Sequence, residues 1–303
     1  MPDLWRDFLA LLVWPGLAGG ALLGWFFMGL NRKLMARMQG RRGPPLFQPF
    51  YDFAKLMGKD TMVPTQFRRS FFYGLPLVSA AAVVWALSLL PVPGNPSSRS
   101  FPGDLILLAY LLEMPALCDV IAGYSSRSLY GEVSAAREAV LSLGYNLPYL
   151  AAIIALAMQV GSFRLRDVMG SAVGPVHVAA GAAFLMAIPA RLKSNPFSIP
   201  NAEQEIVSGA HTEFNGAPLA MLELGQGLEI VALAGFFSML FIPKAANSFA
   251  IWALYFLIST AVVVFMTLLA ASTARIKVHQ AFRFYWTWGA LAAAVAFVAA
   301  AIW

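Results

Sequence analysis

Eight apolar runs, each about 20 residues long, set the strongest limit on how this chain can fold. A helix of about 20 apolar residues is long enough to cross the hydrocarbon core of a bilayer. The charged fraction is 12%, about half that of an ordinary soluble domain. The sequence therefore predicts an all-α, polytopic membrane protein, with residues 1–303 as a single integral membrane domain, rather than a soluble helical protein. The predicted spans are 8–30, 71–92, 105–124, 139–161, 172–190, 218–242, 248–271 and 285–303.

The positions of lysine and arginine indicate which way the spans run. Sixteen of the 21 basic residues lie in four alternate connections, 31–70, 125–138, 191–217 and 272–284. Because Lys and Arg accumulate in loops that stay in the cytoplasm, we expect these four connections on the cytoplasmic side of an inner membrane and both termini outside. The basic residues expected on the outer side are Arg6, Arg99, Arg164, Arg166 and Lys244.

Composition also excludes several kinds of partner and cofactor. The net charge of +6 comes from short loops rather than from one solvated face, which argues against nucleic-acid binding. Cys118 is the only cysteine, so the chain can form no internal disulfide and no cysteine cluster for zinc or iron–sulfur. His177, His211 and His279 are far apart in sequence, and we interpret each as a surface or interface histidine rather than a haem ligand. We therefore expect no cofactor in this chain.

The polar connection 191–217 has a functional pattern of its own. Its 27 residues carry three carboxylates, Glu203, Glu205 and Glu213, within eleven positions. Long loops are usually functional or disordered, and the aromatic and aliphatic residues within this one argue against disorder. We interpret it as an ordered loop that presents acidic side chains.

The first connection contains a predicted amphipathic helix. The residues from Gly43 to Pro45 favour a turn, Pro49 suits the first turn of a helix, and Gly58 marks its end. A short helix with one apolar face and one polar face is typical of a segment at the membrane surface. It is either a lipid-binding basic patch or a docking platform for a soluble partner. The apolar residues on one face of this helix are Phe50, Phe53, Ala54 and Met57.

Four carboxylates interrupt the apolar runs. Glu113 and Asp119 lie in span 105–124, and Glu223 and Glu229 lie in span 218–242. Ionisable groups in a membrane are costly and commonly mark ion or proton routes, although a position near the headgroups or a pairing with arginine explains Glu229 equally well. Burial favours the neutral form of a carboxyl group, so such groups can exchange protons near neutral pH. Residues that weaken these helices locally, and so admit water or backbone carbonyls, are Pro115, Gly225 and Gly227.

The connection 125–138 continues the same chemistry. It contains Glu132, Arg137 and Glu138 just before the fourth span. Arginine in such a place pairs readily with a carboxylate. We expect Arg137 to pair with an acid, and the loop 191–217 supplies candidates.

Four stretches, at residues 39–59, 123–139, 195–214 and 274–285, resemble one family in the same order. The family is the membrane subunit shared by respiratory complex I, where it is called the H subunit, and the energy-converting (group 4) membrane-bound [NiFe] hydrogenases. The compact stretch 42–52 is more similar to the hydrogenase branch, since complex I members usually carry a longer Gly-Pro-rich insertion there. The sequence Arg137-Glu138-Ala139 favours the same branch.

The resemblance implies a subunit without redox centres. Such a subunit fastens a peripheral arm, made of an iron–sulfur small subunit with [4Fe-4S] clusters and a large [NiFe] or quinone-reducing subunit, to antiporter-like membrane subunits. In complex I it also forms much of the quinone cavity. The residues that the resemblance and the membrane acids together assign to ion coupling are Glu203, Glu205, Glu213, Glu113, Asp119, Glu223, Arg137 and Glu138. The residues assigned to docking of the peripheral arm are Arg41, Arg42, Gln48, Asp52 and Lys55.

This chain departs from the family pattern at several acidic positions. Asn146 stands where relatives commonly have a membrane glutamate, and an amide cannot pass a proton as a carboxyl group does. We expect Glu113 or Asp119 to substitute for the missing acid. The other departures are Ser198, Asn201 and His279, each at a position where an acid is common.

Three functions remain open at this point. The leading hypothesis is a non-catalytic coupling subunit of an ion-pumping hydrogenase. The second keeps the fold but makes the partner a quinone reductase, so that the chain forms a quinone cavity. The third is a stand-alone ion-coupled transporter, although the sequence has no internal repeat of the kind that many transporters show.

Overall fold

The computed structural model describes residues 2–95, 100–169, 171–242 and 248–303, which form helices and turns without a β-strand. Seven helical segments in these ranges are long and apolar enough to cross a membrane, and α8 (Pro175–Arg191) is a shorter apolar helix. The predicted all-α membrane fold is confirmed, with a helix at each of the eight predicted spans. The long segments contain α2 (Leu17–Met38), α4 (Arg69–Leu89), α5 (Asp104–Ser125), α6 (Leu129–Val160), α10 (Gly216–Leu240), α11 (Ser248–Ser272) and α12 (Val278–Phe284) with α13 (Ala290–Ile302).

Several predicted span boundaries were wrong. The run 8–30 is interrupted between α1 (Pro2–Leu12) and α2, because Pro15 has no N–H to donate and a Cβ at Gly16 would lie 2.0 Å from the Leu11 carbonyl oxygen. Helix α6 begins ten residues before the predicted start at 139, so most of 125–138 is helix rather than loop. The last helical segment likewise begins at Val278 rather than at 285. Hydropathy marks the apolar part of a helix, whereas hydrogen bonding continues through polar turns.

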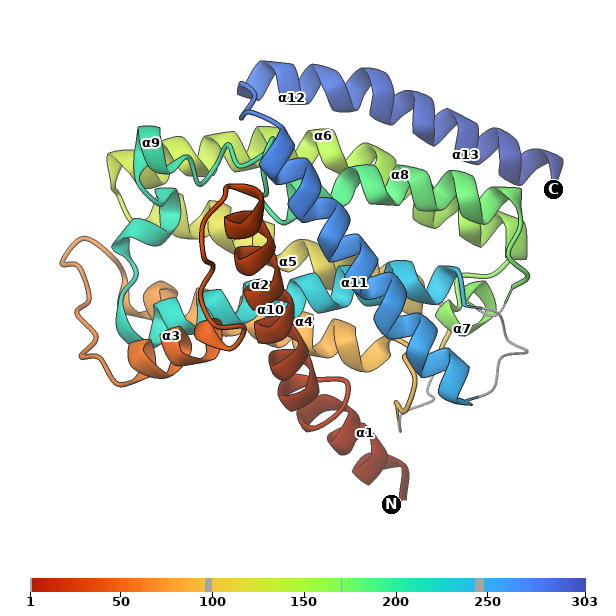
Figure 1. Ribbon diagram of the computed structural model, residues 1–303, viewed down its shortest axis with the longest axis horizontal. Helices are drawn as coiled ribbons and strands as arrows, with labels where there is room; N and C mark the ends of the chain where they lie inside the picture. The colour runs from red at the N-terminus through yellow and green to blue at the C-terminus, as the bar shows by residue number, and fades with distance from the viewer. Residues whose placement is uncertain (1, 96–99, 170, 243–247) are drawn as a thin grey trace.

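Helix α10 is the most deeply buried of the long helices in the described ranges. It packs against α2, α4 and α11, while α6 packs against α5, α8 and α13. Contacts between α4 and α5 join these two groups of helices. In Figure 1, α6, α8 and α13 run along the long axis in the upper part of the molecule, and α2 and α11 cross in front.

The two ends of the helix array differ. Helix α3 (Gln48–Met57) and the segment between α8 and α10 lie at one end, and α7 (Leu165–Val168) and the C-terminus lie at the other (Figure 1). The predicted amphipathic helix is confirmed as α3, in which Phe50 and Phe53 pack on Trp25 of α2 with ring centroids 5.0 and 5.3 Å apart. Its position at a membrane surface and the orientation of the termini stay predictions. Arg99 and Lys244, expected on the outer side, lie outside the described residues.

Glycines allow α2 and α10 to touch through their backbones. A Cβ added to Gly24 would lie 2.7 Å from the carbonyl carbon of Gly227. Small residues let helices approach closely where lipid offers no hydrophobic driving force. The contact therefore depends on glycine at position 24.

We predict that Gly24→Ala destabilises the protein by about 1–3 kcal/mol, because the added methyl group must push two helix backbones apart. The matched control is Gly74→Ala on α4, where an added Cβ meets nothing within 4 Å. Thermal unfolding of the purified protein in detergent measures both. Equal unfolding midpoints for Gly24→Ala and the wild type would show that the close approach contributes nothing.

Candidate functional site

A cluster of buried charged side chains lies where α5, α6, α8 and α10 meet. Arg191, the last residue of α8, is 1% exposed at its side chain. Its Nη1 donates to Oε2 of Glu113 at 2.7 Å, and its Nη2 donates to the carbonyl oxygen of Leu112. The guanidinium carbon also lies 4.3 Å from the ring centre of Tyr149 and 5.5 Å from that of Tyr145. Arg191 is thus held by an ion pair, a backbone carbonyl and two aromatic rings.

Glu113 has strong donors on both of its oxygens. While Arg191 contacts Oε2, Nδ2 of Asn146 donates to Oε1 at 2.9 Å. Glu113 and Asn146 also line a cavity of about 420 Å³ between α5 and α6, which leaves the Glu113 side chain 25% exposed. The amide of Asn146 therefore serves as a hydrogen-bond donor to Glu113.

A second ion pair forms two residues after Arg191. Lys193 lies in the turn after α8, where its Nζ contacts Oδ2 of Asp119. Burial alone would lower the pKa of Lys193, but the neighbouring acids, Asp119 above all, raise it above the ordinary lysine value. The amine therefore stays protonated. Oδ1 of Asp119 also lies 3.1 Å from Nε2 of His211, which belongs to the short helix η1 (Gly209–Glu213).

Glu138 is a buried acid without a hydrogen-bond partner in the described part of the chain. Its side chain is 1% exposed, and neither carboxyl oxygen makes a hydrogen bond within the described part of the chain. Nζ of Lys193 lies 3.9 Å from Oε1, close enough for electrostatic attraction but too far for a hydrogen bond. Glu138 thus differs from Glu113 and Asp119, which both receive direct donors.

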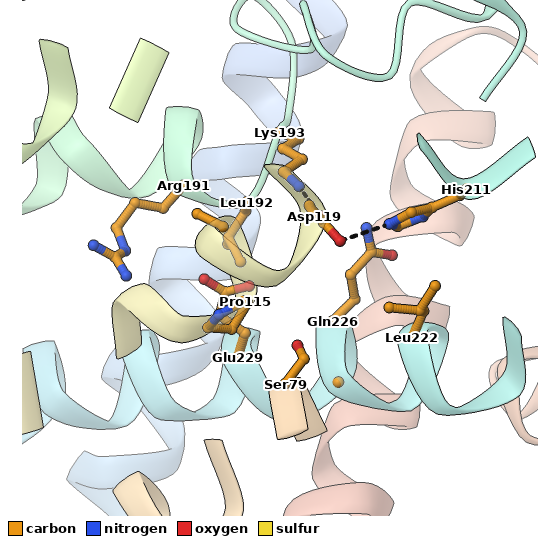
Figure 2. A pocket seen from close by; sticks show the side chains of 12 residues that line it. Ser79, Pro115, Asp119, Arg191, Leu192, Lys193, His211, Leu222, Gln226 and Glu229 are labelled. Carbon is orange, nitrogen blue, oxygen red and sulfur yellow. Dashed lines mark hydrogen bonds and ion pairs between the residues drawn. The ribbon is translucent and has the colours of Figure 1, made fainter. Parts of the chain in front are cut away.

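Glu229 of α10 completes the cluster. It is 6% exposed and borders a cavity of about 20 Å³, roughly the room that one water molecule needs. Figure 2 shows Asp119, Lys193 and His211 around this cavity, with Gln226 and Glu229 of α10 on its other side. The predicted helix-weakening residues Pro115 and Gly225 line it too, although α5 and α10 continue through them as unbroken helices.

The acids of the loop 191–217 lie outside the cluster. Glu203 and Glu205 are exposed on α9 (Glu203–Ile206), and Glu213 is half-buried at the end of η1. The predicted pairing of Arg137 is present, since its Nη1 lies 2.6 Å from Oε2 of Glu205. The loop is also fixed to α6 by Ser134, whose hydroxyl donates to the carbonyl oxygen of Pro200 at 2.7 Å. An ion pair therefore joins the exposed loop to the residue that precedes Glu138.

Glu223 and the residues assigned to docking lie near α3. Oδ2 of Asp52 accepts a hydrogen bond from Arg32 at 2.7 Å, and Oδ1 accepts one from Gln48 at 2.9 Å. Partial burial would raise the pKa of Asp52, but these two donors lower it below its ordinary value. Glu223 is half-buried on α10, within electrostatic range of Arg32 and Asp52. The exposed members of the docking set are Arg41, Arg42 and Lys55.

Sequence reasoning missed the cations of the cluster. We interpreted Arg191 and Lys193 only as loop residues that report topology, yet both are buried against acids. The interpretation of His177 as a surface or interface residue was also wrong, since it is 1% exposed and lies 2.9 Å from the hydroxyl of Ser171. His211 is partly buried, and its contact with Asp119 was not foreseen. The sequence held one signal for this cluster. Two basic residues follow the apolar run 172–190 directly, and two other runs contain acids that could pair with them.

Comparisons with known proteins agree with this architecture. A family model described as NADH dehydrogenase matches residues 13–301. The H subunit of the NADH-quinone oxidoreductase of Syntrophotalea carbinolica is 28% identical, with 94% of this chain and 93% of the relative covered. Its counterpart in Bacillus thuringiensis subsp. konkukian is 26% identical, with 94% and 91% covered.

A solved structure is similar over nearly the whole chain. It is a chain of the membrane-bound sulfane sulfur reductase (MBS), described as an archaeal respiratory membrane complex. The TM-score is 0.87 at 29% identity, with 99% of this chain and 100% of that chain covered. The resemblance drawn from the sequence motifs is confirmed: this chain is a multi-pass membrane protein that belongs to the NADH dehydrogenase family, alongside the H subunits of NADH-quinone oxidoreductases.

Proposed function

We propose that this chain is the redox-centre-free membrane subunit of an ion-translocating, membrane-bound [NiFe] hydrogenase complex of the cytoplasmic membrane. In this proposal it anchors a peripheral electron-transfer arm and couples redox chemistry to the movement of protons or sodium ions. The observation that carries the proposal is the ion pair between the exposed acid Glu205 and Arg137, the residue next in sequence to the buried Glu138, which itself lies 3.9 Å from Lys193.

This connection suits a coupling role because it joins two different environments. Glu205 is 54% exposed at its side chain, where a docked protein can change its surroundings, whereas Glu138 is 1% exposed. A change in charge at the surface acts on buried groups more strongly than on solvated ones, since the interior screens it less. Arg137 and Glu138 are consecutive residues of α6, so in this proposal a change in the pairing of Arg137 with Glu205 alters the charge close to Glu138.

Support for the hydrogenase branch comes from the first loop and from Arg137-Glu138-Ala139. In the structure the first loop turns compactly after α2 and enters α3. Arg41 and Arg42 are exposed in this turn and Lys55 on α3, which gives a basic surface for a soluble partner protein. In this proposal the [4Fe-4S] clusters and the [NiFe] centre belong to partner subunits, and antiporter-like subunits adjoin the chain in the membrane.

A second candidate is a role in a quinone reductase. The observation that favours it is an apolar groove of about 670 Å³ between α1, α2, α4 and α10, with Phe53 of α3 at its edge. Such a groove fits an isoprenoid or acyl tail. Trp25 has the one side-chain hydrogen-bond donor among the groove's lining residues, so the groove by itself suits a tail better than a quinone headgroup.

The matched solved complex adds a further electron acceptor to the comparison. That complex is a sulfane sulfur reductase, whereas the curated relatives are subunits of NADH-quinone oxidoreductases. Proteins of this fold therefore serve complexes with different reactions. The partner subunits, rather than this chain, decide which acceptor is used.

The first test isolates the chain with whatever binds it. We expect affinity purification from native membranes to recover iron–sulfur and large hydrogenase-type subunits, and the preparation to evolve hydrogen from a reduced electron donor. Assays with a quinone and with a sulfane sulfur compound run in parallel. Hydrogen evolution supports the proposal. Reduction of quinone or of sulfane sulfur in its place would assign the chain to a quinone reductase or to a sulfane sulfur reductase. An active chain isolated without redox subunits would indicate a stand-alone transporter.

The second test addresses the loop acids. Replacing both Glu203 and Glu205 with Gln should lower the number of ions moved per electron several-fold while the complex stays assembled, and Glu205→Gln should account for most of the loss because Glu205 pairs with Arg137. Glu132→Gln, an exposed acid at the start of α6, is the control. Ion movement and electron transfer are measured together in vesicles that contain the purified complex. An unchanged ratio in the double variant would remove the loop acids from the coupling path.

A further inference from the structure

Lys193 lies between two buried carboxyl groups. Its Nζ contacts Asp119 and lies 3.9 Å from Oε1 of Glu138. The side chains of Lys193, Asp119 and Glu138 are 8%, 12% and 1% exposed, respectively, so water screens them little. One permanent cation therefore serves two acids in the interior.

The contacts show which of the two acids is ionised. Asp119 receives Lys193 on one oxygen and His211 on the other, whereas Glu138 accepts no hydrogen bond in the described part of the chain. A buried carboxylate without a direct partner is costly and takes up a proton instead. In this geometry Asp119 is the carboxylate and Glu138 is the neutral carboxyl group.

The other charged groups around Glu138 are already paired or lie on neighbouring helices. Arg191 is held by Glu113 and by two tyrosine rings, and Arg137 is held by Glu205. The remaining titratable groups around this site are Glu229 on α10, Tyr145 on α6 and His211 on η1. Within the described ranges, Lys193 is therefore the cation that forms an ion pair with Glu138, and its other ion-pair partner is Asp119.

We propose that Lys193 is a tethered cation that exchanges between Asp119 and Glu138 while one proton passes from the Glu138 carboxyl group to the Asp119 carboxylate. The O–H bond of Glu138 breaks, an O–H bond forms on Asp119, and the ammonium group moves to the carboxylate that the proton has left. Lys193 keeps its charge throughout, so the net charge of the three groups does not change. Only the role of this exchange in ion coupling rests on the proposed function.

Local structure suits such a movement. Lys193 follows the last turn of α8 and has a flexible four-carbon side chain, while the distance to its second partner is only 3.9 Å. The cavity of about 20 Å³ borders both Asp119 and Lys193, so it has room for a water molecule at the Asp119 end of the exchange. Lys193 is thus a positioning residue that sets which of the two acids holds a proton.

The test uses infrared difference spectroscopy of the full-length chain in its membrane complex, in lipid vesicles. A protonated carboxyl group has a carbonyl-stretch band of its own, and Glu138→Gln identifies the band of Glu138 by removing it. The exchange predicts that Asp119→Asn also removes this band, because Lys193 then pairs with Glu138 and ionises it. Glu132→Gln, on the same helix but exposed, should keep the band. A Glu138 band of wild-type intensity in Asp119→Asn would overturn the proposal.

If Asp119→Asn does not fold, the infrared spectra of the wild-type complex still test the exchange. When the temperature is changed at constant pH, which shifts the exchange without adding protons, the carboxyl bands of Asp119 and Glu138 should change in opposite directions, and Glu138→Gln should show neither change. Independent bands would contradict the exchange. Ion movement is measured separately. A complex that shows the exchange but moves no ions would contradict the proposed function and leave the exchange standing. A Glu138→Gln complex that moves ions like the wild type would show that the exchange has no role in coupling.

Discussion

The interior of this protein is organised by the cost of burying charge. Removing one partner from a buried ion pair costs roughly 3–5 kcal/mol, because the other charge is left without compensation. Arg191 and Lys193 meet this constraint by contacting Glu113 and Asp119 on α5, which fixes the end of α8 against that helix. The turn that carries Lys193 begins the long loop, so the same contacts set where the loop starts.

From this constraint the position of the loop follows. The segment after Lys193 crosses α6, where Ser134 and Arg137 hold it through the carbonyl oxygen of Pro200 and the carboxylate of Glu205. Arg275, in the connection before the last helical segment, donates a hydrogen bond of 3.0 Å to the hydroxyl of Ser198. From the sequence resemblance we expected an acid at this position, and the hydroxyl of Ser198 instead accepts a hydrogen bond from arginine. The ordered loop expected from the sequence is thus held by contacts from two other parts of the chain.

Hydropathy was sufficient to predict the helices but not the site. Each apolar run corresponds to a helix because a long apolar segment in lipid must satisfy its backbone hydrogen bonds internally. The start of α6 was missed because Glu132, Arg137 and Glu138 lower its hydropathy, although they lie on helix. The cluster could not be predicted in full because it depends on which helix faces meet: Glu113, Asn146 and Arg191 are distant in sequence and adjacent in space. Asn146 read alone suggested a lost proton carrier, whereas the structure shows a donor that helps hold Glu113.

In the proposed mechanism, coupling depends on the buried cation Lys193, which Asp119 and Glu138 share. The loop 191–217, which begins beside this cation, is the part that a peripheral arm contacts. The most direct measurement is the number of ions moved per electron transferred by the purified complex in vesicles, compared between the wild type and Lys193→Met. With no cation between them, Asp119 and Glu138 lose the charge that distinguishes their proton affinities. The mechanism predicts an assembled complex that transfers electrons but moves few or no ions. A ratio equal to that of the wild type would contradict it.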